Sequence, residues 1–165
     1  MSFVNRIIDF NEILDNLFIG ECPKSPEAVA HLRDSAGITA ILNLQSADDI
    51  KTVGIDFNSL WKRIIMMKVA YRRVEILDLN PEDLLKKLDE AVAVLDELIS
   101  GGHKVYLHCT YGINRSPTVA AAYLIKIRGM DASSAGNFIR ERRSSILYDD
   151  VLLKMERRLK DPTEK

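Results

Sequence analysis

The sequence has little cysteine and no long apolar run, and each of these features excludes a class of protein. Only two of the 165 residues are cysteine, Cys22 and Cys109, too few for the disulfide framework of a small secreted domain. No stretch approaches the roughly 20 apolar residues of a membrane-spanning helix, and the opening segment MSFVNR lacks an apolar signal region. We therefore expect a cytoplasmic protein in a reducing compartment that does not bind membranes.

Neither sign of charge dominates, and residues that bind metals are sparse. A net charge of −1 argues against a protein that coats nucleic acid. The basic groups at 62–63, 72–73 and 140–143 are interpreted mainly as solvated faces. His31 and His103 stand alone, and no pair of histidine, cysteine or acidic residues has the spacing of a zinc site. We predict no metal, no cofactor and no nucleic-acid partner.

The chain shows no repeat, low-complexity segment or linker, and 47% of its residues are apolar. We therefore predict one soluble, monomeric domain, residues 1–160, with a frayed tail at 161–165. Trp61, Met66 and Met67 are expected in its core. Residues 45–55 are predicted to be a polar loop.

Elsewhere, apolar patterns and capping residues predict alternating strands and helices. The strands are expected at 17–22, 38–44, about 72–77 and 105–107. The helices are expected from Ser25 to Gly37, over 57–67, from Asn80 to Gly101, from Pro117 to about Gly129, and over about 132–142 and 149–159. This order predicts a single-domain α/β sandwich, in which helices flank a central, largely parallel sheet. Ligands collect at the carboxyl edge of such a sheet.

The stretch VYLHCTYGINRSP, Val105 to Pro117, is a strand, a tight loop and the start of a helix. We call residues 109–115 the phosphate loop, because their backbone N–H groups can converge on an anion at a helix N-terminus. Gly112 allows the turn, and Arg115 can bind two phosphate oxygens with its planar fork. The predicted phosphate site consists of His108, Thr110, Tyr111, Gly112, Ile113, Asn114 and Arg115.

Cys109 lies at the floor of this predicted site. Inward N–H dipoles and a guanidinium should lower its pKa well below the roughly 8.5 of a free cysteine, so the group is expected to be a thiolate. A thiolate there can attack phosphorus and form a cysteinyl-phosphate that water then hydrolyses. Ser116 can donate a hydrogen bond to the departing thiolate, and His108 is expected to order the loop. Cys22 is expected to be inert.

A leaving alkoxide or phenoxide needs a proton, and Asp78 is positioned to supply it. It follows a predicted strand, so it should lie at the same edge of the sheet as Cys109. Asp83 can instead cap the following helix. We predict Asp78 as the general acid, with Glu75 and Asp83 as alternatives.

The residues from His108 to Ser116 carry the signature H-C-x-x-G-x-x-R-S. The segment closely resembles the cysteine-dependent phosphatases of the protein tyrosine phosphatase superfamily, and the compact chain is similar to their dual-specificity branch. The resemblance implies a dual-specificity phosphatase-like fold, with Cys109 as nucleophile, Arg115 as phosphate binder, Asp78 as acid and Ser116 assisting thiolate release.

A second resemblance covers most of the chain. Residues 17–60, together with Asp78 in the run VEILDLN, are similar to the starch-excess-type glucan phosphatases of plants. That family usually has alanine and glycine where this chain has Tyr111 and Asn114.

The same family lines its glucan channel with aromatic residues. The matching positions here are Thr52, Val53 and Leu79, which leaves Phe10 as the remaining aromatic.

These observations predict a phosphomonoester hydrolase for phosphotyrosine, phosphoserine, phosphothreonine or aryl phosphates. A glucan phosphatase is the leading alternative. The loop HCTYGINRS is also similar to RNA 5′-triphosphatases. A phosphate-binding module without catalysis is a further alternative, against which the joint presence of Cys109, Arg115 and Asp78 argues.

Overall fold

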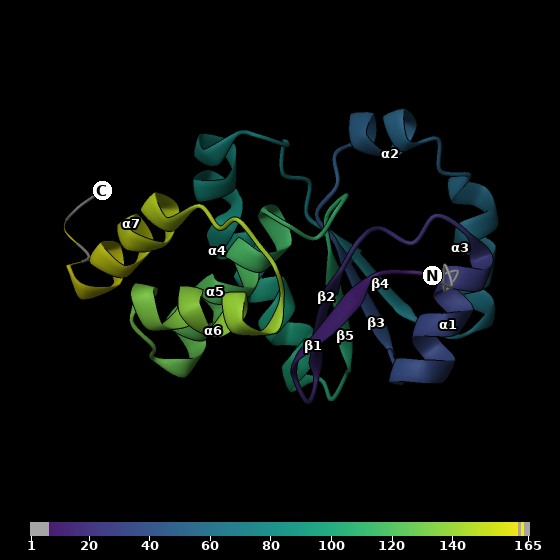
Figure 1. Cartoon of the computed structure of the whole chain (residues 1–165), viewed down its shortest axis with the longest axis horizontal. Helices are drawn as coiled ribbons and strands as arrows, with labels where there is room; N and C mark the ends of the chain where they lie inside the picture. The colour runs from purple at the N-terminus through teal and green to yellow at the C-terminus, as the bar shows by residue number, and fades with distance from the viewer. Residues whose placement is uncertain (1–6, 162, 164–165) are drawn as a thin grey trace, which may run out of the picture.

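A central five-stranded sheet separates two layers of helices (Figure 1). The structure is a computed structural model, and it describes residues 7–161 and residue 163. The segment MSFVNR, from which we predicted the absence of a signal region, lies outside the described residues, as does most of the predicted tail. No helix within the described ranges is both long and apolar enough to cross a bilayer.

The sheet has the strand order β1-β2-β5-β3-β4. Its strands are β1 (Phe10–Leu14), β2 (Leu17–Gly20), β3 (Ala40–Asn43), β4 (Ala70–Arg73) and β5 (Val105–His108). Among the strand pairs of the described residues, β1–β2 is antiparallel and the other three are parallel. Gly20 and Asn43 both align with His108, so β2, β3 and β5 end at one edge of the sheet. The α/β fold with a largely parallel sheet is confirmed.

Residues of β5 alternate between the two layers, as the period of a strand requires. Val105 and Leu107 join the larger core, and Tyr106 joins the smaller one. The larger core is covered by α4 (Pro81–Ser100), α5 (Arg115–Arg128), α6 (Ala132–Arg142) and α7 (Asp149–Lys160). The smaller core is covered by α1 (Pro26–Ala36) and α3 (Phe57–Met66).

The predicted polar loop at 45–55 is wrong, because it contains the helix α2 (Ala47–Val53). Ser46 and Asp49 form a reciprocal capping box, in which each side chain accepts a hydrogen bond from the other residue's backbone N–H. None of the helix's residues is buried, so it has no apolar stripe that a pattern search would detect. Figure 1 shows α2 beyond the end of the sheet, away from both helical layers.

Two strands also differ from the prediction. β1 was not predicted, and it pairs with β2 across a tight turn at Asp15 and Asn16. β4 covers residues 70–73 rather than 72–77. Beyond it the N–H groups of Val74 and Ile76 still donate to carbonyls of the β3 end and of Leu44, which keeps the following segment beside the sheet.

The core prediction is wrong for Trp61 and Met66. Met66 is 66% exposed, and Trp61 is 39% exposed and stacks on Phe57 with 6.2 Å between ring centroids. α3 is amphipathic and buries Leu60 and Ile64. Trp61 and Met66 therefore lie on the outer side of the helix. Met67 is partly buried against the smaller core.

Candidate active site

The phosphate loop joins the buried end of β5 to the start of α5. Cys109 is buried at 3% exposure, and Arg115 and Ser116 are more deeply buried still. The helix begins at Arg115, two residues earlier than predicted, so the loop lies at the N-terminus of a helix. Such a terminus favours an anion through its unpaired N–H groups and its dipole.

Every carbonyl from Thr110 to Asn114 accepts a hydrogen bond from outside the loop. Because a trans peptide unit is planar, its N–H points opposite to its C=O. The N–H groups of residues 111–115 are therefore turned away from these partners and toward the interior of the loop. The donors are Cys22 N to Thr110 O (2.9 Å), Arg143 Nη2 to Tyr111 O (3.2 Å), Arg143 Nε to Gly112 O (2.7 Å), Ile146 N to Ile113 O (2.9 Å) and Thr118 N to Asn114 O (3.0 Å).

Gly112 is required at its position for two reasons. Its φ of 66° lies in the left-handed region that glycine adopts without a Cβ penalty. A Cβ would also lie 2.4 Å from the carbonyl oxygen of Gly20 and 2.9 Å from Arg143 Nη2. The glycine therefore leaves the space that β2 and the Arg143 guanidinium occupy.

The Cys109 sulfur lies 3.4 Å from the Ser116 hydroxyl oxygen, within hydrogen-bond distance for sulfur. Burial alone raises the pKa of this thiol. Hydrogen bonds from the hydroxyl and backbone N–H of Ser116 and from the N–H of Gly112, with the charge of Arg115, outweigh burial and lower the pKa below its ordinary value. The surroundings of the sulfur therefore favour the thiolate.

His108 contacts the loop backbone and not the sulfur. Its Nδ1 lies 2.9 Å from the carbonyl oxygen of Cys109, so it must be the donor. Burial, followed by the nearby charge of Arg115, lowers the pKa of this histidine from 6.5 to about 4. A neutral ring that donates to the loop agrees with an ordering role.

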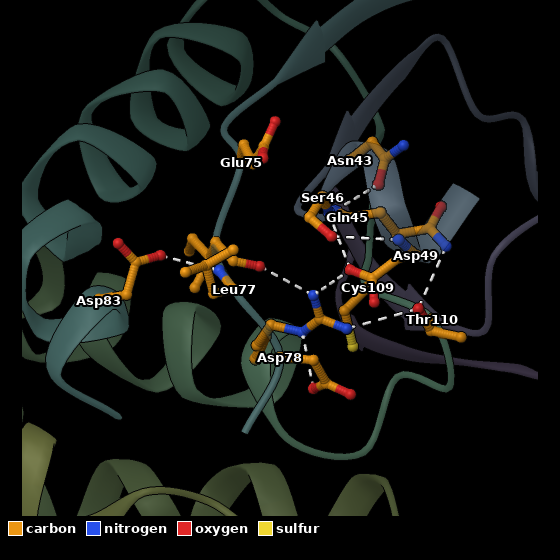
Figure 2. Close-up of polar contacts among 12 residues, drawn as sticks. Asn43, Gln45, Ser46, Asp49, Glu75, Leu77, Asp78, Asp83, Cys109 and Thr110 are labelled. Atoms are coloured by element: carbon orange, nitrogen blue, oxygen red, sulfur yellow. Dashed lines mark hydrogen bonds and ion pairs between the residues drawn. The ribbon is translucent and has the colours of Figure 1, made fainter. Parts of the chain in front are cut away.

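Arg115 is held on several sides by hydrogen bonds and ion pairs (Figure 2). Nη1 donates to Asp49 Oδ2 at 2.6 Å and to the carbonyl of Ile76 at 2.9 Å, and Nη2 lies 3.4 Å from Thr110 Oγ1. Nε is 3.2 Å from Asp78 Oδ1, close enough for an ion pair. Within the described residues, however, this buried N–H has no acceptor in hydrogen-bond geometry. An anion inside the loop would complete its coordination.

Asp49 and Gln45 also belong to the site, although neither was among the predicted site residues. Burial raises the pKa of the Asp49 carboxyl, but hydrogen bonds from Arg115 and Ser46 and the Arg115 charge lower it more. Gln45 is buried and donates to Thr110 Oγ1 at 3.2 Å. The polar run from Gln45 to Asp49 between a strand and a capping box was the available signal.

Of the three carboxylates considered as the acid, Asp78 is the one that contacts Arg115 (Figure 2). Asp83 accepts a hydrogen bond from the Leu77 N–H at 2.8 Å and forms an ion pair with Lys87. It therefore holds the segment between β4 and α4 that carries Asp78. Glu75 pairs with Arg73 at 2.6 Å. The structure thus brings Asp78, Arg115 and Cys109 to one place and leaves the two alternatives outside it.

In the basic group at 140–143, Arg140 and Arg142 are exposed as predicted, but the prediction is wrong for Arg143, which is 5% exposed. Its guanidinium also binds Asn11 Oδ1 at 2.8 Å and Asp9 Oδ2 at 3.2 Å. Asn114 has a comparable tethering role, since its Nδ2 donates to the carbonyl of Ile146 at 2.9 Å. Neither contact was evident from the sequence, because both join segments far apart along the chain.

A groove of about 560 Å³ opens between the start of α4 and the start of α7, with Glu82, Leu85, Tyr148 and Lys154 among its lining residues. Burial, followed by the charge of Asp78, raises the pKa of Tyr148, and Cys109 and Arg115 also act on it. Tyr148 therefore lies near both the loop and the groove. In the described part of the chain, no three histidine, cysteine or acidic side chains are arranged to hold a metal ion.

Comparison with known proteins defines the class. Residues 17–156 match the family model of the dual specificity phosphatase catalytic domain. The structure of PTPMT1 superposes with a TM-score of 0.75 over 93% of this chain and 98% of that one, at 20% identity, which shows a shared fold. The chain therefore belongs to the dual specificity phosphatase family.

Two relatives show the range within this family. Phosphoglucan phosphatase DSP4 of Castanea sativa is 33% identical over 139 residues, which cover 83% of this chain and 37% of that protein. Dual specificity protein phosphatase 1B of Arabidopsis thaliana is 33% identical over 138 residues, which cover 82% and 72%. The chain spans less than half the length of several relatives, including 48% of mouse laforin.

The lowered pKa of Cys109 predicts selective alkylation. The rate of labelling by iodoacetamide should rise with pH through an inflection below the ordinary pKa of a cysteine thiol, because the pKa of Cys109 is lowered. Ser116→Ala should move the inflection to higher pH, because the thiolate loses a donor. Mass spectrometry of the labelled peptides gives the site. Cys22, whose pKa burial raises to about 11, serves as the internal control, and earlier labelling of Cys22 would contradict this prediction.

The ion pair between the partly buried Asp49 and the buried Arg115 predicts a stability cost if it is broken. Asp49→Asn should lower the free energy of unfolding by about 3 kcal/mol, the lower end for breaking a buried pair, because Asp78 and a carbonyl still contact the guanidinium. Denaturant unfolding measures the change. Asp48→Asn, on the exposed neighbour, is the matched control and should change stability by less than about 0.5 kcal/mol. Equal effects of the two substitutions would show that the pair contributes nothing specific.

Proposed function

We propose that this protein is a cysteine-dependent phosphomonoester hydrolase that acts on phosphorylated proteins. One observation carries the proposal: a buried thiol of lowered pKa lies at the floor of a loop whose N–H groups face inward, beside an unsatisfied Arg115 N–H. A phosphate group can accept hydrogen bonds from all of these donors. Membership of the dual specificity phosphatase family supports the same activity.

In the first step, the Cys109 thiolate attacks phosphorus in line with the ester oxygen. The S–P bond forms, the bond from phosphorus to the leaving oxygen breaks, and Asp78 gives that oxygen a proton. Inward N–H groups and Arg115 stabilise the charge on the equatorial phosphate oxygens. Phosphate oxygens would compete with Asp78 for Arg115 Nε, so binding favours release of the carboxyl group toward the leaving oxygen.

In the second step, water attacks phosphorus and the S–P bond breaks. Asp78, now a carboxylate, takes the proton from water, and sulfur leaves as a thiolate. The Ser116 hydroxyl, 3.4 Å from the sulfur, is placed to stabilise that thiolate by a hydrogen bond. The products are inorganic phosphate and the original enzyme, and no metal or redox partner enters either step.

Phosphoproteins fit the mouth of the site. Tyr111 is 62% exposed at the rim of the loop, where its ring can contact a flat aryl ester or a peptide side chain. The neighbouring groove at Tyr148 offers space for the chain beyond the phosphorylated residue. The family's dual-specificity members in human and Arabidopsis are named as protein phosphatases, which supports this substrate class.

A phosphoglucan is the second candidate, favoured by the similarity to the chestnut phosphoglucan phosphatase. The aromatic platform that would hold a sugar chain is weak here. Leu79 is 79% exposed and aliphatic, and Thr52 is exposed on α2. The Phe10 ring contacts Phe18 and Tyr106, with centroids 6.2 and 6.1 Å away.

A substrate panel tests this function. p-Nitrophenyl phosphate, phosphotyrosine and phosphothreonine peptides, phosphorylated amylopectin and 5′-triphosphorylated RNA should be compared at one enzyme concentration, with released phosphate as the readout. We expect turnover of the aryl phosphate and peptides, weak release from amylopectin and negligible release from RNA. Cys109→Ser should lower turnover by roughly four orders of magnitude or more. Faster release from amylopectin than from peptides would instead establish the glucan activity.

The proposed role of Asp78 predicts a dependence on the leaving group. Asp78→Asn should lower kcat on alkyl phosphates by roughly 10²- to 10⁴-fold, because a poor leaving group needs the proton. Aryl phosphates with acidic phenols should be affected much less. Glu75→Gln, on the alternative that pairs with Arg73, is the matched control. A uniform loss over all leaving groups in Asp78→Asn would exclude Asp78 as the acid.

A further inference from the structure

Arg143, at the end of α6, donates hydrogen bonds to two carbonyl groups of the phosphate loop. It follows α6, its side chain is 4% exposed, and four of its donor contacts are made within the described residues. Two go to the loop carbonyls of Tyr111 and Gly112, and two go to Asp9 and Asn11. A buried guanidinium is costly unless its N–H groups are satisfied, and these partners satisfy most of them.

The peptide geometry gives these contacts a consequence for catalysis. Arg143 Nη2 holds the Tyr111 carbonyl outward at 3.2 Å, so the N–H of the same peptide unit, that of Gly112, points inward. That inward N–H is among the groups that lower the pKa of Cys109. Arg143 Nε holds the Gly112 carbonyl outward at 2.7 Å, which turns the N–H of Ile113 inward in the same way.

The other three outward carbonyls of the loop are held mainly by backbone N–H groups, from Cys22, Ile146 and Thr118. Arg143 is thus the side chain that fixes the two central peptide units. A Cβ at residue 112 would lie only 2.9 Å from Arg143 Nη2. The glycine of the phosphate loop therefore leaves room for this guanidinium as well as allowing the turn.

We propose that Arg143 is a positioning residue for the phosphate loop, orienting two inward N–H groups toward the anion and the Cys109 thiolate. The inference rests on the proposed phosphatase function and adds a residue from the far end of the chain to its machinery. Asp9 and Asn11 hold the guanidinium in turn, so the segment around β1 supports the loop through it.

The test measures the loop itself rather than turnover alone. Arg143→Lys keeps a cation, but its single nitrogen carries only three donors and cannot reproduce four contacts that arise from three separate nitrogens. We expect the inflection pH for Cys109 alkylation to rise and orthovanadate to bind about tenfold or more weakly, since small displacements of oriented donors are costly. Arg142→Gln is the matched control, because its exposed guanidinium lies over the Phe138 ring outside the loop. It should leave both values unchanged.

A stability measurement and a second variant distinguish a change in the phosphate loop from a loss of folding. Thermal unfolding of each variant fixes a working temperature at which it is folded, and Asn11→Ala supplies a milder variant that retains Arg143. Asn11→Ala should shift both readouts in the same direction by a smaller amount. Loss of thermal stability in Arg143→Lys with unchanged alkylation and vanadate binding would overturn the proposal. Failure of the wild-type protein to bind vanadate would instead refute the phosphatase function.

Discussion

The site depends on one constraint, that a peptide unit directs its N–H and its C=O to opposite sides. A loop that presents five N–H groups to an anion must turn five carbonyls outward, where they are buried and need donors. This chain recruits those donors from Cys22, Arg143, Ile146 and Thr118. The packing of several elements around β5 is therefore also the means by which the loop acquires its electrostatic character.

A second constraint is the burial of a positive charge beside the thiol. Arg115 lies almost fully inside the protein, and Asp49 and Asp78 both contact it. Asp49 binds through Nη1 with good hydrogen-bond geometry, whereas Asp78 contacts Nε without it. The two carboxylates thus differ: Asp49 is a fixed counterion, and the contact of Asp78 is the one that phosphate can replace at little cost. This difference explains how the charge of Arg115 is neutralised before phosphate binds, and how its Nε–H can still bind the phosphate.

Local patterns predicted much of this structure, and non-local contacts account for what they missed. The strand, turn and helix around Cys109 are encoded in contiguous residues, so their prediction needed no tertiary information. Asp49 is 66 residues from Arg115 and lies on a helix without buried residues. Arg143 lies in a basic run that is solvated in most helices. The residues next to Asp49 and Arg143 in the sequence give no sign of the distant partners that determine the roles of these two side chains.

The phosphate loop does not by itself select the substrate. The loop chemistry of thiolate, N–H groups and arginine recognises only the phosphate, so it is compatible with a glucan or a protein ester. Selectivity must come from the surface around Tyr111, Leu79 and the groove at Tyr148, and these segments lie outside the signature. Leu79 has a φ of 52°, which displays its side chain on an exposed turn directly after Asp78. An aliphatic side chain there offers dispersion contacts to a peptide but no ring on which a sugar can stack, and this favours the phosphoprotein assignment.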